Sequence, residues 1–337
     1  MRCAVLMSLL ASCLLAAVAP TPAQAAERPV PHSEPAPGAP TRIALWPSGK
    51  VPGESTFATV PNVIERSRDS ALPDRYIDNV SAPYLVAYRP ARPNGTALLV
   101  IPGGGYQRIV LDKEGTALVP AFVEQAGVTL FVLRYRLPAG RADRQAALAD
   151  AQRAMRVIRA GAAKWQLDPQ RVGVIGFSAG GHVAARLSNG YATALPGIGD
   201  ATDALSARPD FALLLYPVID MGRHAHSGSR TRLLGEHPTP ALEQQYSMQA
   251  QVSVQTPPTF LVHAQDDAVV SVHNSLLYYQ ALLAAGVPTE MHLFAHGAHG
   301  FGVRLPTGAP AAQWPALALR WMQGQGQGQG QGAEKTP

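Results

Sequence analysis

The sequence has almost no cysteine, and both of its cysteines lie in the first 25 of its 337 residues. Beyond Cys3 and Cys13 the chain has no residue that forms a disulfide. Cysteine nucleophiles and thiolate metal sites are excluded there for the same reason. We expect a core held by apolar packing, and a function that needs no metal and no cofactor.

Charge is scarce as well, since 15% of the residues are charged and 47% are hydrophobic. The formal net charge of +5 comes from scattered lysines and arginines, without a basic block or interleaved aromatic residues. A nucleic-acid-binding surface normally needs such a cluster, so we expect no nucleic-acid partner. No internal repeat of roughly 20–50 residues is present, which argues against a solenoid.

The first 25 residues have the organisation of a secretory signal peptide. Arg2 supplies the positive start, an apolar stretch follows, and a small-x-small cleavage site, "AQA", ends at Ala25. We therefore expect a secreted or periplasmic protein with no membrane contact in its mature form. One alternative stays open, because "LASC" ending at Cys13 resembles a lipoprotein cleavage site and would leave a lipid anchor.

Segments of biased composition flank the remainder of the chain. Residues 26–41 contain five prolines and are expected to form a linker. Residues 323–337 begin with a glutamine-glycine repeat and are expected to form a disordered tail. A single domain at 42–322 lies between them.

Strand-like and helix-like segments alternate along this domain. Short apolar runs predict strands at 96–101, 128–136, 171–177, 211–217, 259–264 and 289–294. Helical patterns cover 143–164, 179–190 and 274–286. Such alternation predicts an α/β fold with a mostly parallel sheet covered on both faces. Residues 218–257 interrupt the alternation and form an insertion, either a lid or pocket wall or a surface decoration.

Ser178 stands in a G-x-S-x-G pattern, with Gly176 and Gly180 at the required offsets. A strand precedes the pattern and a helix follows it, which is the context of a sharp turn that exposes a nucleophilic serine. The same letters also occur in glycine-rich loops that carry no chemistry. A serine hydroxyl is a weak nucleophile at neutral pH, so the pattern needs a base and an acid elsewhere in the chain.

Candidate partners for the serine lie after the next predicted strands. Asp266 and Asp267 follow 259–264, and His296 and His299 follow 289–294. The carboxyl ends of parallel strands meet at one edge of a sheet, so these side chains are expected near Ser178. Adjacent aspartates also serve as turn residues and helix caps, and loop histidines are often merely exposed. A metal site is disfavoured because no third ligand matches the histidine pair.

The run "IPGGGY" at 101–106 supplies the remaining part of such a site. Backbone N–H groups in the loop after an early strand stabilise the anionic oxygen of a tetrahedral intermediate. The N–H groups of Gly104 and Gly105, together with that of Ala179 after the serine, are the candidates for this oxyanion hole. A phosphate-binding loop is the alternative, but neither of its glycine patterns is present.

From about residue 43 to 322 the chain resembles the secreted αβ-hydrolase carbohydrate esterases that are grouped with acetylxylan esterases. The matching stretches include "NGTALLVIPGGGYQRIVLDKEG", "GVIGFSAGGHVAARL" and "TPPTFLVHAQDDAVVSVHNSLLYYQALLAAGVPTEMHLFAHGAHGFG". This fold is shared with the catalytic domains of prolyl oligopeptidase-type serine peptidases. The resemblance implies an αβ-hydrolase fold with a mostly parallel central sheet.

The resemblance also assigns roles to individual residues. It implies Ser178 as nucleophile and His299 as base, because His299 opens the run "HGFG". It favours Asp267 as the acid, since relatives have D-x-x-V-P with a serine eight residues on, which is Ser275 here. Ser271 replaces the proline, and Asp266 stays open as the alternative acid. His182 is interpreted as helix packing or pocket wall.

The implied function is a serine esterase that removes small acyl groups, above all acetyl, from plant polysaccharide or oligosaccharide. The partner is then an acylated carbohydrate substrate. Two alternatives remain, a prolyl oligopeptidase-like serine peptidase and a general carboxylesterase acting on small esters.

Overall fold

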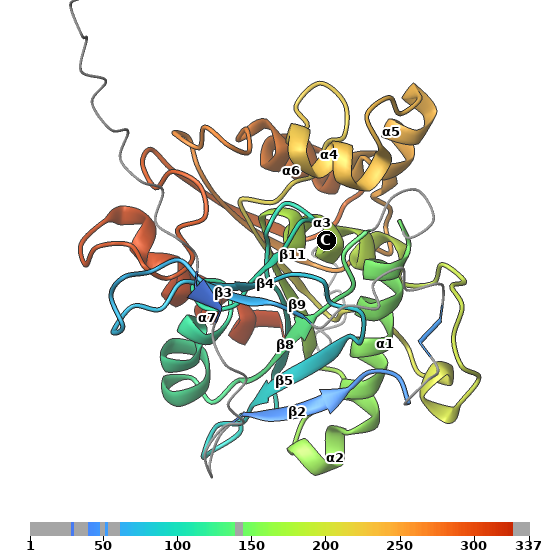
Figure 1. Ribbon diagram of the computed structural model, residues 1–337, viewed down its shortest axis with the longest axis vertical. Helices are drawn as coiled ribbons and strands as arrows, with labels where there is room; N and C mark the ends of the chain where they lie inside the picture. Colours follow the sequence, from blue (N-terminus) through green and yellow to red (C-terminus); the bar gives the residue numbers. More distant parts are fainter. Residues whose placement is uncertain (1–27, 30–39, 48–50, 53–60, 139–143, 326–337) are drawn as a thin grey trace, which may run out of the picture.

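The computed structural model describes residues 28–29, 40–47, 51–52, 61–138 and 144–325 (Figure 1). The expected signal peptide, its cleavage site and both cysteines lie outside the described residues. So do most of the expected linker and most of the expected tail. Within the described ranges, no helix is both long and apolar enough to cross a membrane.

An eight-stranded sheet forms the centre of the molecule. Its strands, in spatial order, are β12 (Thr289–Phe294), β11 (Thr259–Ala264), β10 (Ala212–Leu215), β9 (Val172–Phe177), β6 (Ala97–Ile101), β8 (Thr129–Arg134), β5 (Tyr84–Tyr88) and β2 (Thr41–Ala44). The first six strands run parallel; at one edge β5 pairs antiparallel with β8, and β2 pairs antiparallel with β5. The sequence prediction of a mostly parallel α/β sheet is thus confirmed.

A second, smaller sheet is entirely antiparallel. It contains β1 (Arg28–Pro29), β3 (Val63–Glu65), β4 (Arg75–Ile77) and β7 (Ile109–Val110), in that order. Its strands have two or three residues each, too short for a periodic pattern to be recognised in the sequence.

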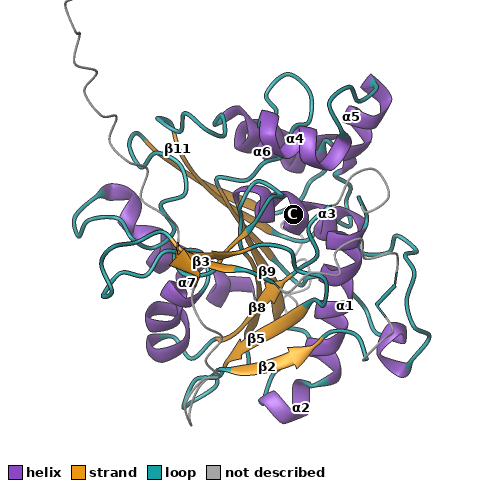
Figure 2. Ribbon diagram, in the orientation of Figure 1, coloured by secondary structure: helices purple, strands orange, loops and turns teal. Residues whose placement is uncertain are grey.

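Helices cover both faces of the large sheet (Figure 2). They are α1 (Ala146–Ala160), α2 (Ala162–Trp165), α3 (Ser178–Gly190), α4 (Ser227–Leu234), α5 (Pro240–Tyr246), α6 (His273–Ala284), α7 (Trp314–Gln325) and the π-helical η2 (Val119–Gln125), with short 3-10 turns η1 (Thr116–Leu118), η4 (Ala201–Ala204), η5 (Met248–Gln251) and η6 (Pro310–Gln313). Side chains of α1, α3 and α6 share one apolar cluster, and those of η2 and α7 share the other. The central strands β6, β8, β9, β10 and β11 are buried on both sides, which is why their sequences are largely apolar.

The observed counterparts of the predicted strands all lie inside their predicted ranges, whereas several helix and segment boundaries differ from the prediction. The helix expected over 143–164 ends at Ala160, because Gly161 closes it and a short second helix, α2, follows. The helix α7 runs through Gln325, past the expected start of the tail at 323, since glutamine continues a helix readily. The strand β2 begins at Thr41, inside the expected linker 26–41.

The insertion at 218–257 is part of the packed structure. It contributes α4, α5 and η5. Figure 1 shows α4 and α5 in yellow above α3. Leu233, Leu234 and Tyr246 from this segment are buried in the same apolar cluster as α1 and α3. The interpretation of this insertion as a pocket wall is therefore favoured over its interpretation as a surface decoration.

Candidate active site

Ser178 lies at the tip of a tight turn between β9 and α3. Its φ of +51° is a left-handed conformation that residues with a side chain rarely adopt. A Cβ on Gly176 would lie 2.6 Å from the carbonyl oxygen of Gly180, and one on Gly180 would overlap the carbonyl oxygen of Ile101. Glycine is required at both positions because the backbone segments pass so close to each other.

His299 lies between Ser178 and Asp267. Its Nε2 is 2.9 Å from Ser178 Oγ, and its Nδ1 is 2.7 Å from Asp267 Oδ2. A carboxylate can only accept hydrogen bonds, so the Nδ1 of His299 carries the proton. Its Nε2 is then free to accept a hydrogen bond, and later the proton, from the serine hydroxyl. The predicted nucleophile, base and acid are thus brought together in the expected order.

The Asp267 carboxylate is buried and held on both oxygens. Its Oδ1 accepts the N–H groups of Val269 and Val270 at 2.9 and 2.8 Å. Burial by itself raises the pKa of Asp267, but hydrogen bonds from His263 and His299 outweigh it and hold that pKa well below its usual range. Asp267 therefore remains charged at neutral pH.

Asp266 faces a different histidine. Its Oδ1 accepts the N–H groups of Gly297 and Ala298 at 3.0 and 2.8 Å, and its Oδ2 is 3.3 Å from His296 Nδ1. These bonds hold the loop that follows β12, and they lower the pKa of Asp266, the Ala298 bond most. The His296 side chain is 88% exposed and does not contact Asp267. The structure thus brings Asp267, and not Asp266, to His299.

The glycine loop after β6 lies directly against the serine turn. A Cβ on Gly103 would lie 2.8 Å from Ser178 Cβ. Gly104 and Gly105 have φ of +136° and +65°, conformations that favour glycine. Their N–H groups and that of Ala179 have no acceptor within the described part of the chain, whereas the N–H of Gly103 is bound to Glu114.

Glu114 is a site residue that the sequence reasoning missed. It is buried, and its Oε2 accepts the N–H of Gly103 at 2.8 Å. Its Oε1 accepts the hydroxyl of Tyr216 at 3.1 Å, and that hydroxyl in turn accepts the N–H of Gly302 at 3.0 Å. Glu114 therefore connects the glycine loop to the loop that carries His299. A charged residue in "LDKEG", directly after a buried strand, was the available signal.

Aromatic and histidine side chains from β10 and the insertion surround His299. The Tyr216 ring meets the His299 ring edge-on, with centroids 5.1 Å apart. His226, at the start of α4, lies beside the glycine loop, where a Cβ on Gly105 would be 3.7 Å from His226 Cε1. Burial, and to a lesser degree the nearby His299, lowers the pKa of His226. Neither Tyr216 nor His226 was predicted as a site residue.

His182 has a structural position, as the sequence analysis expected. It is fully buried on α3, and its Nε2 donates to the carbonyl oxygen of Tyr246 at 2.8 Å. Its Nδ1 therefore accepts the hydroxyl of Tyr106 at 2.6 Å. Burial first, and the charge of Arg186 second, lower the pKa of His182 to about 3. It joins the end of the glycine loop to the insertion and does not contact Ser178 Oγ.

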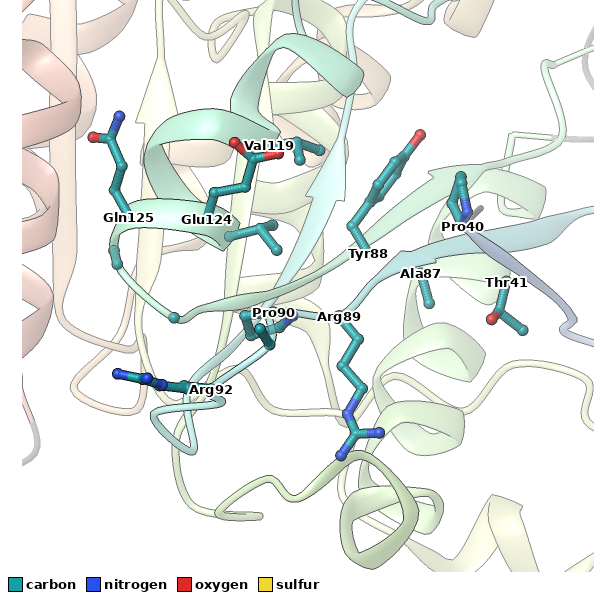
Figure 3. A pocket seen from close by; sticks show the side chains of 14 residues that line it. Pro40, Thr41, Ala87, Tyr88, Arg89, Pro90, Arg92, Val119, Glu124 and Gln125 are labelled. Atoms are coloured by element: carbon teal, nitrogen blue, oxygen red, sulfur yellow. The ribbon is translucent and has the colours of Figure 1, made fainter. Parts of the chain in front are cut away.

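A hollow of about 720 Å³ lies elsewhere on the molecule (Figure 3). Its lining includes Tyr88, Arg89, Arg92, Glu124 and Gly127. Tyr88 pairs with the beginning of β8, so the hollow is at the amino ends of the parallel strands. Ser178 and its partners follow the carboxyl ends, where α/β sheets bind their ligands. We therefore place the functional site at Ser178.

Comparisons with known proteins agree on the family to which this chain is similar. The BD-FAE family model matches residues 85–282. An acetylxylan esterase of Xylanibacter ruminicola is 36% identical over 223 residues, which cover 65% of this chain and 43% of that protein. An endo-1,4-beta-xylanase B of Butyrivibrio fibrisolvens is 36% identical over 208 residues, covering 61% and 32% respectively. The chain thus spans less than half the length of these two relatives.

Solved structures agree with this grouping. An acetyl ester-xyloside bifunctional hydrolase from Caldicellulosiruptor lactoaceticus superposes with a TM-score of 0.69 at 35% identity, covering 85% of this chain and 96% of that one. The carboxylesterase Cest-2923 from Lactobacillus plantarum gives 0.60 at 30% identity, covering 78% and 98%. The family-model match over more than half of the chain shows that this protein belongs to the BD-FAE family, and the superpositions show that it has the αβ-hydrolase fold.

Proposed function

We propose that this protein is an exported serine esterase that removes small acyl groups, principally acetyl, from plant polysaccharide or oligosaccharide. The observation that carries the proposal is the contact chain from Ser178 Oγ through His299 to Asp267. The similarity to an acetylxylan esterase and to xylan-active proteins supports the carbohydrate substrate. Export is supported only by the signal-peptide pattern of residues 1–25.

The reaction begins when Ser178 Oγ attacks the ester carbonyl carbon. His299 Nε2 takes the serine proton as the bond forms, and Asp267 stabilises the resulting imidazolium. The carbonyl oxygen becomes negative and is bound by the N–H groups of Gly104, Gly105 and Ala179. One such donor typically contributes about 3 kcal/mol to transition-state stabilisation.

Collapse of this first intermediate releases the sugar hydroxyl, which receives its proton from His299. The acyl group is then attached to Ser178. His299, neutral again, removes a proton from water, and the hydroxide attacks the acyl carbonyl. The second collapse returns the proton to Ser178 and releases the carboxylic acid.

The test measures hydrolysis of p-nitrophenyl acetate and of acetylated xylan by the wild-type protein and by Ser178→Ala. We expect both substrates to be hydrolysed and the variant to lose activity by several orders of magnitude. Hydrolysis of aryl acetate without release of acetate from xylan would favour a general carboxylesterase, which the likeness to Cest-2923 makes the second candidate. Cleavage of prolyl peptides without esterase activity would refute the proposal.

A further inference from the structure

Two histidines face the same oxygen of Asp267. His299 Nδ1 is 2.7 Å from Asp267 Oδ2, and His263 Nε2 is 3.3 Å from that atom. His263 belongs to β11, four residues before Asp267, and is completely buried. The proposed reaction uses His299 only, so the role of the second imidazole is unassigned.

The contacts of His263 determine where its proton lies. Its Nε2 is hydrogen-bonded to the carbonyl oxygen of Val270 at 3.0 Å and also lies 3.3 Å from Asp267 Oδ2. Both neighbours are acceptors, so Nε2 must carry a hydrogen, which lies between the two. Its Nδ1 is 2.7 Å from the hydroxyl of Ser275 on α6. That hydroxyl has no other acceptor among the described residues, so it donates to Nδ1. Ser275 thereby favours the neutral imidazole with its proton on Nε2.

We propose that His263, oriented by Ser275, is a positioning residue that donates to Asp267 Oδ2 and sets how strongly Asp267 holds the protonated form of His299. The inference rests on the proposed function, in which His299 is the base. It also gives a purpose to the serine eight residues after Asp267. Within the described residues Ser275 is hydrogen-bonded to His263 and not to Asp267, so it acts through His263.

The expected effect follows from sharing one carboxylate oxygen between two donors. A hydrogen bond to the charged form of a carboxylate disperses its charge and makes it a weaker partner for an imidazolium. Removing the His263 donor concentrates the charge on His299. The protonated form of His299 is then favoured, its pKa rises, and less of it is free to accept the serine proton at acidic pH.

Other titratable groups near His299 do not change in this comparison. His226 reaches toward it from α4, and the Tyr216 ring contacts it from the end of β10. Lys113 and Glu114 lie beside the same loop, where a Cβ on Gly300 would be 3.6 Å from Lys113 Nζ and 3.8 Å from Glu114 Oε1. None of these four groups is replaced in the variants of β11 and α6, so we attribute a shift in the His299 titration to Asp267.

The direct test is an NMR titration of the His299 imidazole in wild type, His263→Leu and His263→Gln, with the signal assigned by its loss in His299→Gln. Leucine removes the donor, whereas the glutamine amide replaces it near the Nε2 position. We expect the pKa of His299 to rise by about 0.5–1 unit in the leucine variant and to stay near the wild-type value with glutamine. An unchanged pKa in His263→Leu would overturn the proposal.

A second variant keeps the test informative if leucine at 263 prevents folding. Ser275→Ala leaves Nδ1 without its donor and should raise the same pKa in the same direction, by a smaller amount. Ser188→Ala on α3 is the matched control, because Ser188 is an equally buried helical serine bonded only to the carbonyl oxygen of Ala184. Equal titrations in both serine variants would contradict the role of Ser275.

Kinetics on p-nitrophenyl acetate give the matching readout. We expect the acidic limb of kcat/KM to move to higher pH in His263→Leu, with KM nearly unchanged. A merely structural role would lower the amount of folded protein without moving this limb. Because the titration uses no substrate, a wild type that hydrolyses no acetyl ester would refute the proposed function and still leave the His263 comparison decisive.

Discussion

Asp266 and Asp267 are adjacent in the chain, yet their carboxylates face different histidines. Asp267 Oδ2 meets His299 Nδ1 at 2.7 Å, while Asp266 binds the backbone of the loop and lies 3.3 Å from His296. Successive side chains leave the backbone in different directions after β11, so only one of the two can reach a given partner. The pair therefore divides into one residue that contacts His299 and one that holds the loop after β12.

The first prediction separates these two aspartates. Asp267→Asn should lower kcat on p-nitrophenyl acetate by roughly 10⁴-fold, because an amide cannot hold His299 in the tautomer that accepts the serine proton. Asp266→Asn should keep kcat within a few-fold, since its carboxylate contacts the exposed end of the loop. If Asp266→Asn were the more damaging change, the assignment of the acid would be wrong.

The second prediction concerns the bond between Glu114 and the glycine loop. Glu114→Ala leaves the N–H of Gly103 and the hydroxyl of Tyr216 without their shared acceptor. We expect kcat to fall by roughly 10- to 100-fold through misplacement of the neighbouring oxyanion donors, with a smaller change in KM. Glu114→Gln retains one acceptor oxygen and should lose less. If the wild type and the alanine variant had equal kcat and KM, the glycine loop would keep its conformation without the bond to Glu114, and the prediction would be wrong.

The third prediction concerns acyl size and His226. The imidazole is fixed by Ser229, whose N–H donates to Nδ1 at 3.2 Å, and it occupies the space beside Gly105. His226→Ala opens this space next to the oxyanion donors. The ratio of kcat/KM for p-nitrophenyl butyrate over acetate should rise about tenfold, the range for a few methylene groups in an apolar pocket. If this ratio does not change, the acyl group does not bind beside His226, and the prediction is wrong.

The fourth prediction follows from the buried contact of Asp112 with Arg75. Burial raises the pKa of Asp112, but hydrogen bonds from Arg75 outweigh it, so the folded-state pKa lies below the unfolded value. The resulting stability is present above the unfolded pKa of about 3.9 and is lost as pH falls through the folded pKa. The melting temperature should therefore drop on acidification below roughly pH 5.

The control for this pH dependence is Asp112→Asn. This variant should melt lower than wild type at pH 7, because it loses the ion pair, but its melting temperature should fall less between pH 5 and roughly pH 3. Thermal unfolding followed by circular dichroism measures both curves. Parallel curves for the two proteins would mean that other carboxylates, Asp267 among them, determine the acid sensitivity.

The central strands and the site's core were predictable because their signals are local. Continuous apolar runs such as 259–264 mark strands buried on both faces, and the serine turn needs its two glycines within five residues. The edge strand β2 and its neighbour β5 were missed because they are only partly buried and so lack a continuous apolar run. Asp267 was favoured by family resemblance, and the geometry then distinguished it from Asp266.

The residues that support the site were not predictable in the same way. Glu114 and Tyr216 meet only because β7 and β10 end near each other in space, although they are far apart in the sequence. His263 resembled any polar residue in a strand until its contact with Asp267 was known. Sequence patterns describe the spacing of residues within one helix or strand. These contacts depend instead on how separate helices, strands and loops pack together.

The bonds of Glu114 have a consequence for the order in which the protein assembles. Gly103, Glu114, Tyr216 and Gly302 come from four separate segments, and one chain of hydrogen bonds joins them. The glycine loop precedes most of the domain in the sequence. The last bond of this chain, from the N–H of Gly302 to the Tyr216 hydroxyl, can form only after the segment that follows β12 has been synthesised. Contacts so distant in sequence require the closure of long loops, which costs chain entropy and slows folding. A chain that lacks the segment after β12 would contain most of the strands of the large sheet but not the complete set of bonds around the glycine loop. The site at Ser178 is therefore complete only when the whole domain has folded.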